Sequence, residues 1–369
     1  MKHISFTLCL FAILTIVTSC GSKETPSEVL TGEIRSYNEF GAAMLDIIGE
    51  DMDKAGFTLG DVITIAIKDT ELVMPYYDGF YTRTGEYLCV NYPTYPSICF
   101  TTTNVGLQEP FTGLEGEHVT ITMKEKAGCI EVQNAMGMKY KNDRDLYPYL
   151  SDEAFANARN VYMGDIPEGR LYRSSTPFSN EICRDRYVSR YLEQEKVMTV
   201  LNLTDTKEKM ESYTEMPTYS RMLWENGDVI LCPLKANPSV DEFNNPLIEA
   251  LIEMSSRPAP YVVHCTEGKD RTGYVCALLE GLCGATYQEM VDDYLKTYDN
   301  YYSVTPDNDP DVCRALVDLR LDPCIMYYAG INDENLLPEV NYAEAFSAFM
   351  LEHGMTQPQL DALIQALTK

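Results

Sequence analysis

The sequence predicts an α/β protein in two parts. The first, residues 31–142, is expected to be a small, mostly-β barrel or sandwich, because short alternating runs punctuated by Gly and Pro fill it. The second, residues 150–369, is expected to hold a mainly parallel central sheet flanked by helices, because β-branched runs alternate there with helical stretches. A chain of 369 residues with 45% hydrophobic content can fill two cores.

The N-terminal part starts with a helical period and continues as strands. In "EFGAAMLDIIGEDMDKAG" (39–56) the apolar spacing predicts a helix closed by Gly49 or Gly56. The runs "DVITIAIK" and "GEHVTITMKE" alternate and predict strands, and "GFYTRTGEYLCVNY" predicts a hairpin with Gly85 in its turn. The aromatic run from Tyr76 to Tyr87 fits barrel core and cross-strand pairing, or alternatively a ligand surface.

The C-terminal part shows strands and helices in alternation. Three runs predict parallel strands: "VMTVLNL" (197–203), "DVILCPL" (228–234) and "YVVHC" (261–265). A helix is expected over 246–256 with Asn245 at its N-cap and Pro246 at its first position. Another is expected over 272–282, stopped by Gly284, and a third from Thr286, where Glu289 completes a capping box.

The first twenty residues, "MKHISFTLCLFAILTIVTSC", predict export. A short polar start precedes an apolar stretch that is too short to span a bilayer comfortably. Small residues before Cys20 resemble the lipobox of bacterial lipoproteins, which implies a lipidated Cys20 followed by a flexible tether over 21–30; an ordinary secretory signal is the alternative. The protein is therefore expected to be exported and to touch a bacterial membrane through its lipid anchor only, while its net charge of −27 argues against nucleic acid as a partner.

The stretch "YVVHCTEGKDRTG" carries the chemistry. Cys265 directly follows a predicted strand, at the edge where open α/β sheets bind ligands, and Arg271 comes six positions later. A loop that passes from a strand into a helix can aim several N–H groups at a phosphate, and Gly268 lets it turn tightly. Arg271 can hold two phosphate oxygens. The same positive field favours a thiolate, which makes Cys265 a candidate nucleophile.

The loop "HCTEGKDRTG" matches the His-Cys-x5-Arg-Thr/Ser signature, and the chain resembles the protein tyrosine phosphatase superfamily. Its Gly-Lys-Asp-Arg-Thr-Gly variant is similar to that of atypical bacterial tyrosine and phosphoinositide phosphatases. "NARNVYMGDIPEGRLYRSS" (157–175) resembles the family's opening and "GMTQPQLDALIQAL" (354–367) its closing helix. The resemblance implies that Cys265 forms a phosphocysteine, that Arg271 and the loop amides bind phosphate, and that Thr272 helps the thiolate leave. It also implies that His264 orders the loop.

The general acid is expected on a carboxylate near this loop. The resemblance implies Asp270 first, and Asp205 in "NLTDTKE" is the runner-up. The family usually has Asp-Leu-Arg-Ser in that second region, whereas this chain has Asn202 where the acidic residue would be. Glu267 is a second departure, because small apolar residues are common at its position; it is expected to face solvent or to select a cationic part of the substrate.

The remaining candidates have two interpretations each. Lys269 either contacts additional phosphates of an inositol ring or only adds positive field. Arg159 and Arg173 either reach the site or, as we favour, pair with acidic side chains of the structure. Cys276 and Cys283, seven positions apart on the following helix, are expected to be buried thiols rather than redox partners of Cys265.

These features predict a phosphomonoester hydrolase without metal or cofactor, most simply a protein-tyrosine phosphatase. Its substrate is expected to be a phosphorylated protein, or alternatively a phosphoinositide or soluble inositol phosphate. The loop residues expected to contact substrate are Thr266, Glu267, Gly268 and Lys269, with Asp205 nearby. Glu267 and the missing Asp-Leu-Arg-Ser leave a rival from another class: a catalytically idle lipoprotein that binds phosphate or a partner.

Overall fold

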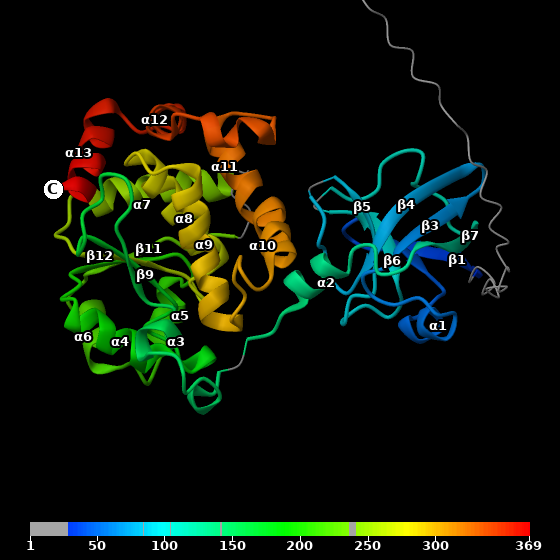
Figure 1. Cartoon of the computed structure of the whole chain (residues 1–369), viewed down its shortest axis with the longest axis horizontal. Helices are drawn as coiled ribbons and strands as arrows, with labels where there is room; N and C mark the ends of the chain where they lie inside the picture. The colour runs from blue at the N-terminus through cyan, green and yellow to red at the C-terminus, as the bar shows by residue number, and fades with distance from the viewer. Residues whose placement is uncertain (1–28, 84, 104, 141, 236–240) are drawn as a thin grey trace, which may run out of the picture.

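A computed structural model of the protein describes residues 29–369 except 84, 104, 141 and 236–240 (Figure 1). The predicted leader, the lipidation site at Cys20 and nearly all of the tether lie outside the described residues. Among the helices that are described, none combines the length and the apolar character that crossing a membrane requires.

The N-terminal part is a closed barrel of seven strands in the order β1-β2-β6-β5-β4-β3-β7. Neighbouring strands pair antiparallel except β4 and β5, which run parallel. The strands are β1 (Val29–Tyr37), β2 (Ala43–Leu45), β3 (Val62–Ile67), β4 (Thr70–Tyr77), β5 (Tyr87–Val90), β6 (Cys99–Thr102) and β7 (His118–Glu125). The predicted mostly-β N-terminal domain is confirmed. Of the two architectures expected for it, barrel or sandwich, the structure has the barrel.

The helix predicted over 39–56 was wrong for its first half. β2 occupies Ala43–Leu45 and only α1 (Gly49–Lys54) is helical. The reason is tertiary pairing: β2 lies between β1 and β6 with all three side chains buried, so its apolar run fills a barrel wall rather than a helix face. Asn38 initiates the turn, since its Oδ1 accepts the N–H groups of Phe40 and Ala42.

The hairpin predicted around Gly85 was also wrong. Residues 78–86 connect β4 to a parallel partner, β5, and β5 forms its antiparallel pair with β6 instead. Gly85 does sit in a turn with a φ of +85°, and its N–H donates to Thr103 O. Tyr76 and Tyr77 are buried, which favours barrel core over a ligand surface for this part of the aromatic run.

The C-terminal part is built on a five-stranded sheet in the order β11-β10-β12-β9-β8. All neighbours are parallel except the edge strand β8, which is antiparallel to β9. The strands are β8 (Arg159–Val161), β9 (Leu171–Ser174), β10 (Thr199–Asn202), β11 (Val229–Leu231) and β12 (Tyr261–His264). The predicted mainly parallel sheet is therefore confirmed, and β12, the strand that leads into the cysteine loop, lies in its centre.

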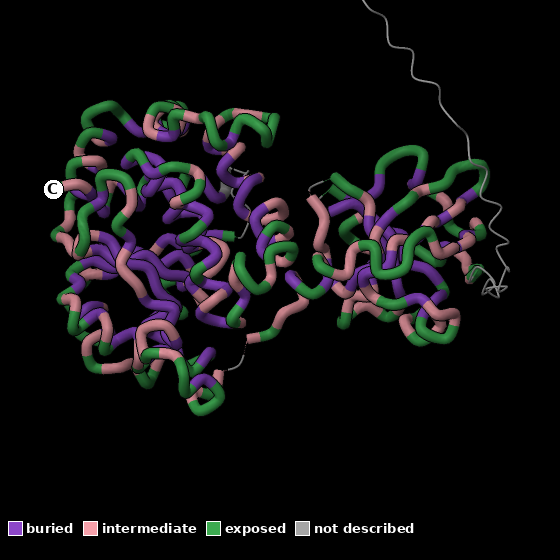
Figure 2. Tube along the Cα trace, in the orientation of Figure 1, coloured by how far each residue is buried: buried purple, intermediate pink, exposed green. Residues whose placement is uncertain are grey.

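Helices cover both faces of this sheet (Figure 1). Val262 packs into the core on one face and Val263 into the core on the other, as the strand period requires. One face carries α3 (Asp152–Phe155), α4 (Asp185–Gln194), α5 (Lys207–Ser212) and α6 (Thr218–Glu225). The other carries α7 (Asp241–Ser255), α8 (Asp270–Leu282), α9 (Tyr287–Tyr302), α10 (Pro310–Leu316), α11 (Asp322–Ala329), α12 (Tyr342–Glu352) and α13 (Gln357–Thr368). Figure 2 shows the buried strands running between these two layers.

Short turns complete the fold, and the predicted helices differ mainly at their starts. The turns are η1 (Arg144–Leu146), η2 (Asn180–Ile182), the π-helical turn η3 (Val317–Leu321) and η4 (Glu334–Glu339). α7 begins five residues before the predicted Pro246, which lies inside the helix, so the expected N-cap at Asn245 was wrong. The capping box at Thr286 and Glu289 is present at the start of α9, as predicted.

A short helix, α2 (Ile130–Gly137), joins the two parts (Figure 1). Val132 packs with the aromatic cluster of the barrel, whereas Ala135 belongs to the core of the C-terminal part. An ion pair between Arg83 and Glu334, 3.0 Å long, crosses the same boundary. The connection therefore packs into both cores.

Candidate active site

The cysteine loop is the turn between β12 and α8, residues 265–269. Cys265 is 3% exposed, and Gly268 has a φ of +69°, a conformation that glycine adopts without strain. The loop also lies against the end of β9: a Cβ on Gly268 would come within 2.3 Å of Ser174 O. Glycine is therefore required here both by its φ and by the close approach of a neighbouring backbone.

Four successive carbonyl groups of the loop, from Thr266 to Lys269, point away from the cavity it encloses, because each accepts hydrogen bonds from residues outside the loop. The carbonyl of Thr266 accepts Thr176 N–H at 3.1 Å. The carbonyl of Glu267 accepts Asn157 Nδ2 at 3.2 Å and the Tyr301 hydroxyl at 2.7 Å.

The next two carbonyls are held in the same way. Gly268 O accepts Asn157 Nδ2 at 3.2 Å and Arg173 Nη2 at 2.9 Å. Lys269 O accepts Arg173 Nη2 at 3.4 Å and Gly273 N–H at 2.7 Å. In a trans peptide unit the N–H points opposite to the C=O. Turning four successive carbonyls outward therefore turns the following N–H groups inward, as binding of a tetrahedral anion requires.

These amides face a cavity of about 380 Å³ that contains the cysteine. Its lining residues are Leu234, Lys235, Cys265, Thr266, Glu267, Lys269, Asp270 and Arg271. We call it the reaction cavity. The structure thus brings the predicted nucleophile, the predicted phosphate-binding arginine and the favoured acid into one space, at the carboxyl end of the central strand.

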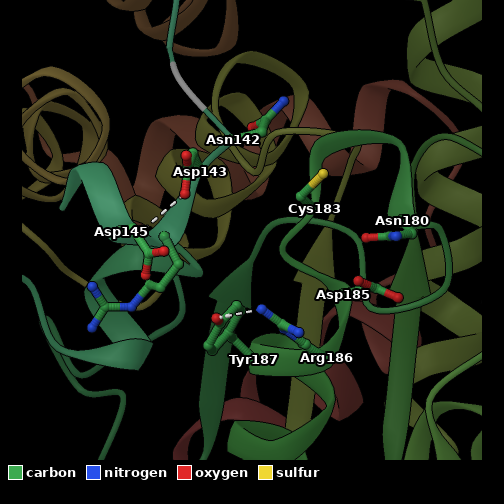
Figure 3. A pocket seen from close by; sticks show the side chains of 9 residues that line it. Asn142, Asp143, Asp145, Asn180, Cys183, Asp185, Arg186 and Tyr187 are labelled. Carbon is green, nitrogen blue, oxygen red and sulfur yellow. Dashed lines mark hydrogen bonds between the residues drawn. The ribbon is translucent and has the colours of Figure 1, made fainter. Parts of the chain in front are cut away.

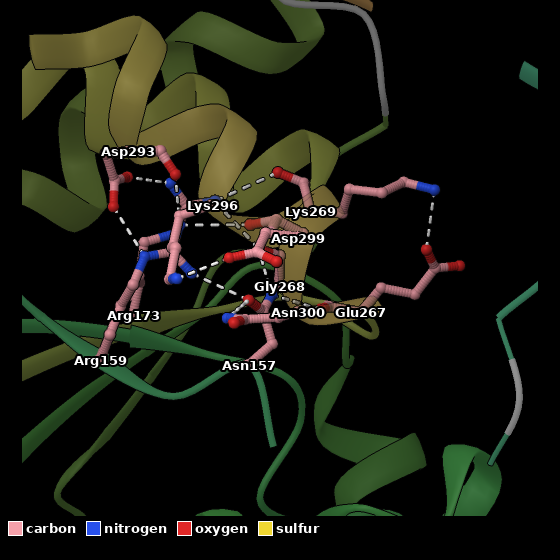
Figure 4. A network of polar contacts seen from close by, with 11 residues as sticks. Asn157, Arg159, Arg173, Glu267, Gly268, Lys269, Asp293, Lys296, Asp299 and Asn300 are labelled. Atoms are coloured by element: carbon pink, nitrogen blue, oxygen red, sulfur yellow. Dashed lines mark hydrogen bonds and ion pairs between the residues drawn. The ribbon is translucent and has the colours of Figure 1, made fainter. Parts of the chain in front are cut away.

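A buried network of polar side chains supports the loop from behind (Figure 4). Arg159 Nε donates to Asp293 Oδ1 at 2.7 Å, and Arg173 Nη1 also contacts the Asp293 carboxylate. Burial alone would raise the pKa of Asp293, but the two arginines lower it well below its ordinary value. Asn157 joins in, since its Oδ1 accepts Arg159 Nη1 at 2.8 Å. One carboxylate on α9 therefore fixes the arginine that holds the loop carbonyls.

Arg271 and Thr272 lie where the sequence predicts phosphate and thiolate contacts. Arg271 Nη1 donates to Leu203 O and Leu234 O, at 3.1 and 3.2 Å, so carbonyls beyond the ends of β10 and β11 orient its guanidinium. Thr272 is fully buried, and its hydroxyl makes no hydrogen bond to any residue in the described part of the chain. That hydroxyl remains available for the predicted bond to the Cys265 sulfur.

His264 has the environment of an ordering residue. Its ring is fully buried against Phe178, and its Nδ1 lies 3.1 Å from Cys265 O. Burial lowers the pKa of His264 to about 4, so the ring is neutral at neutral pH. A neutral imidazole that bonds the carbonyl of the nucleophile fits the predicted structural role.

Charged side chains of both signs lie at the mouth of the reaction cavity. Lys269 Nζ is 2.9 Å from Glu267 Oε2 and 3.9 Å from Asp270 Oδ2. Burial lowers the pKa of Lys269, but nearby Asp270, Tyr298 and Glu267 outweigh burial and raise it. Glu267 therefore neither faces solvent freely nor stands unpaired in the cavity. Tyr294 donates to Asp270 Oδ1 at 3.4 Å, and the Asp270 side chain remains 36% exposed, so solvent and substrate can reach it.

Comparison with known proteins identifies the chain. Residues 153–368, more than half of the sequence, match the family model described as the tyrosine phosphatase family. The chain belongs to the tyrosine phosphatase family. The predicted enzyme class, a cysteine-dependent phosphatase resembling protein tyrosine phosphatases, is confirmed, and its substrate carries a phosphate of some kind. None of the curated proteins matches the sequence significantly.

Solved structures resemble parts of this phosphatase. An uncharacterized conserved protein from Thermotoga maritima is 20% identical over 26% of this chain and 36% of its own length, with a TM-score of 0.22. The core catalytic domain of the PP-IP phosphatase SIW14 from S. cerevisiae is 18% identical over 42% of this chain and 86% of its own, with a TM-score of 0.26. TpbA from P. aeruginosa is 16% identical, over 45% and 92%, with a TM-score of 0.25. The family assignment rests on the family model.

The runner-up acid, Asp205, does not line the reaction cavity of the phosphatase. It is 4% exposed, and its carboxylate accepts Asn202 Nδ2 at 3.0 Å and the Tyr213 hydroxyl at 2.7 Å. It lines a neighbouring cavity instead. The geometry therefore favours Asp270, which lines the same cavity as Cys265.

All ten cysteines in the described part of the phosphatase are free thiols. Cys276 and Cys283 are buried on and just after α8, in the hydrophobic core, as predicted. Arg159 and Arg173 pair with Asp293, as favoured from the sequence, although Arg173 also holds the loop.

A further cavity of about 490 Å³ lies between η1, η2 and the start of α4 (Figure 3). Asp143, Asp145 and Asp185 line it together with Arg144 and Arg186. The Arg144 guanidinium already donates to Leu150 O at 2.7 Å and to Asp152 at 3.2 Å. The acidic side chains that remain make this cavity a poorer phosphate site than the reaction cavity.

Replacing Asp293 with Asn should lower the free energy of unfolding by about 3 kcal/mol, because two buried arginines lose their carboxylate. The pKa of Asp293 is lower in the folded state, so its contribution is present at neutral pH and is lost as the pH falls below the ordinary carboxyl value. Urea unfolding at neutral and acidic pH measures both effects. Asp292→Asn is the matched control, since the Asp292 carboxylate is exposed and, among the described residues, accepts a hydrogen bond only from Gln288, at 2.8 Å. Equal unfolding midpoints for the two variants would show that Asp293 does not anchor the network.

Proposed function

We propose that the protein hydrolyses phosphomonoesters through a phosphocysteine on Cys265. The Cys265 sulfur attacks phosphorus, and the bond from phosphorus to the leaving oxygen breaks as Asp270 gives that oxygen its proton. Water then attacks the phosphocysteine and returns a proton to Asp270, and the sulfur leaves as inorganic phosphate forms. The observation that carries this proposal is the outward turn of the carbonyls at Thr266 to Lys269, which aims amides into the space over a buried thiol.

The phosphate in the reaction cavity would be bound by Arg271 and the inward amides. Donors placed where charge develops supply a large part of the rate enhancement in acyl and phosphoryl transfer. Thr272 would donate to the sulfur as it leaves. Gly268 contributes through its backbone alone.

As the substrate we propose a phosphorylated polyol, such as an inositol phosphate, whose alcohol is the leaving group. None of the eight residues lining the reaction cavity is aromatic, and three of them, Lys235, Lys269 and Arg271, carry positive charge. A phenyl ring would find Leu234 as the only purely aliphatic side chain among these eight, whereas additional phosphates or hydroxyls would find donors. Phosphotyrosine on a protein is the second candidate, favoured by the description of the family that the chain matches.

Asp270→Asn tests the assignment of the acid. A nitrophenolate leaves without a proton, whereas the alkoxide of an inositol needs one. We expect kcat to fall by about a hundredfold or more with an inositol monophosphate and by about tenfold or less with p-nitrophenyl phosphate. Stopped assays of released phosphate on both substrates give the ratio. Equal losses on the two substrates would move the acid to another group.

From the sequence alone we also propose that the protein is exported and held at a membrane by a lipid on Cys20. The motif before Cys20 supports this anchoring, and residues 1–28 lie outside the described structure. Incorporation of a radiolabelled fatty acid into the wild type, compared with Cys20→Ser, tests it.

A further inference from the structure

A second cavity, of about 330 Å³, adjoins the reaction cavity. Thr266 lines both. At their boundary the hydroxyls of Thr204 and Thr266 lie 3.0 Å apart, and Thr266 Oγ1 also accepts Arg271 Nη2 at 3.4 Å. A substrate with its phosphorus over Cys265 would therefore have this second space next to its leaving group.

Every residue that lines the second cavity has a polar or charged group in its side chain. Its lining residues are Thr176, Ser179, Glu181, Thr204, Asp205, Thr206, Lys209, Tyr213 and Thr266. Six of these nine carry a hydroxyl, and none has a purely aliphatic side chain. We call it the hydroxyl cavity. Its chemistry differs from the reaction cavity, where charge dominates.

Asp205 is the fixed acceptor of the hydroxyl cavity. It is a buried carboxylate whose Oδ2 accepts Asn202 Nδ2 and whose Oδ1 accepts the Tyr213 hydroxyl. Asn202 also shapes the turn, since its Oδ1 accepts the N–H groups of Thr204 and Asp205 at 2.9 and 3.0 Å. Each carboxylate oxygen has two lone pairs. Asp205 can therefore accept a further hydrogen bond without moving.

Several wall hydroxyls are also fixed by their own turns. Thr176 Oγ1 accepts Phe178 N–H at 3.3 Å, and Ser179 Oγ accepts Glu181 N–H at 3.3 Å. Thr206 caps α5 in the same way, accepting Lys209 N–H at 3.3 Å. A hydroxyl that accepts through one lone pair can still donate its proton. The walls thus hold both donors and acceptors in fixed positions. A ligand hydroxyl, which donates and accepts, can bind to both.

We infer that the hydroxyl cavity binds hydroxyl groups of the leaving group when the substrate is a phosphorylated polyol. The inference rests on the proposed phosphomonoesterase activity and assigns its leaving-group subsite to Ser179, Thr204 and Asp205. A tyrosine ring would bring an apolar face to polar walls. A basic peptide side chain would find Glu181 and Asp205 but would also meet the Lys209 ammonium, so the test below includes a peptide with such side chains.

The test compares Ser179→Ala with Ser256→Ala, a matched control whose exposed hydroxyl, in the turn after α7, donates to Glu253 O. The substrates are p-nitrophenyl phosphate, an inositol monophosphate, and a phosphotyrosine peptide with flanking arginines. We expect Ser179→Ala to lower kcat/KM for the inositol phosphate about fivefold relative to p-nitrophenyl phosphate, and Ser256→Ala to leave that ratio unchanged. Asp205→Asn should lower the same ratio by about tenfold, through KM rather than kcat.

Each outcome decides one point. If wild-type protein hydrolyses none of these substrates, the proposed function fails before the subsite is in question. If the wild type is active but Ser179→Ala and Asp205→Asn lower kcat/KM equally on all substrates, the subsite is wrong. If only the arginine-flanked peptide is sensitive, the hydroxyl cavity receives basic side chains and the polyol inference is overturned.

Discussion

Cys265→Ser is expected to abolish turnover of p-nitrophenyl phosphate, the largest effect of any single change in this protein. A serine hydroxyl is a weak nucleophile at neutral pH unless a base activates it. The nearest candidate, His264, directs its Nδ1 to Cys265 O and is buried among apolar groups. The amides and Arg271 are unchanged, so the variant should still bind phosphate. Initial rates with EDTA present, together with phosphate binding by calorimetry, measure the two effects separately.

Cys276→Ser is the matched control for this change. Cys276 is buried on α8 and is not among the residues that line the reaction cavity, so its variant should keep wild-type activity. Activity that survives in Cys265→Ser would exclude the phosphocysteine. A wild type that binds phosphate without turnover would instead support the idle, phosphate-binding interpretation.

The part of the site that could be predicted from the sequence is the part that is local in the chain. Cys265, Gly268 and Arg271 lie within seven residues, and a strand before them and a helix after them are enough to predict a nest of amides. The structure places all three around one cavity or its backbone wall. Sequence spacing is informative here because one short loop makes the whole arrangement.

The groups that hold this loop come from distant segments, and the roles of most of them could not be predicted from the sequence. Asn157 and Arg173 belong to the segment 157–175, which resembles the family's opening, but nothing local in the sequence shows that their targets are loop carbonyls. Asp293 follows Asp292 in α9, and only its position in the helical period could indicate which of the two side chains faces the core. Met290 is buried, and position 293 lies three residues on, on the same face, so the period points Asp293 inward. That signal was available but weak, because acidic residues usually face solvent.

In the barrel, strand pairing rather than apolar periodicity determines the secondary structure of residues 43–45. Residues 43–45 fit an apolar helical period, yet as β2 they bury all three side chains between β1 and β6. A three-residue strand is too short to show an alternating pattern. The barrel class could therefore be predicted from the longer strands β3 and β7, whereas this segment could not.

Gly268→Ala is expected to lower kcat/KM by at least about a thousandfold, the second large effect. The new Cβ would lie 2.3 Å from Ser174 O and 2.8 Å from Ser175 N. That backbone cannot easily move, because Ser174 pairs with His264 across β9 and β12 and Ser175 Oγ donates to Ala156 O at 2.8 Å. The loop must shift instead, which carries several amides and the Cys265 sulfur out of alignment with phosphate. Steady-state kinetics and iodoacetamide alkylation of Cys265 measure the two consequences.

Gly284→Ala separates the clash from the cost of the backbone conformation. Gly284 has a φ of +88°, but a Cβ there would meet nothing within 4 Å. Both variants should lose about 1–2 kcal/mol of unfolding free energy from the left-handed conformation, and only Gly268→Ala should lose catalysis. Matching kinetics in the two variants would mean that the loop can shift from β9 without losing its function. The support that β9 gives the loop would then be unnecessary, and the outward carbonyls alone would have to account for the geometry of the site.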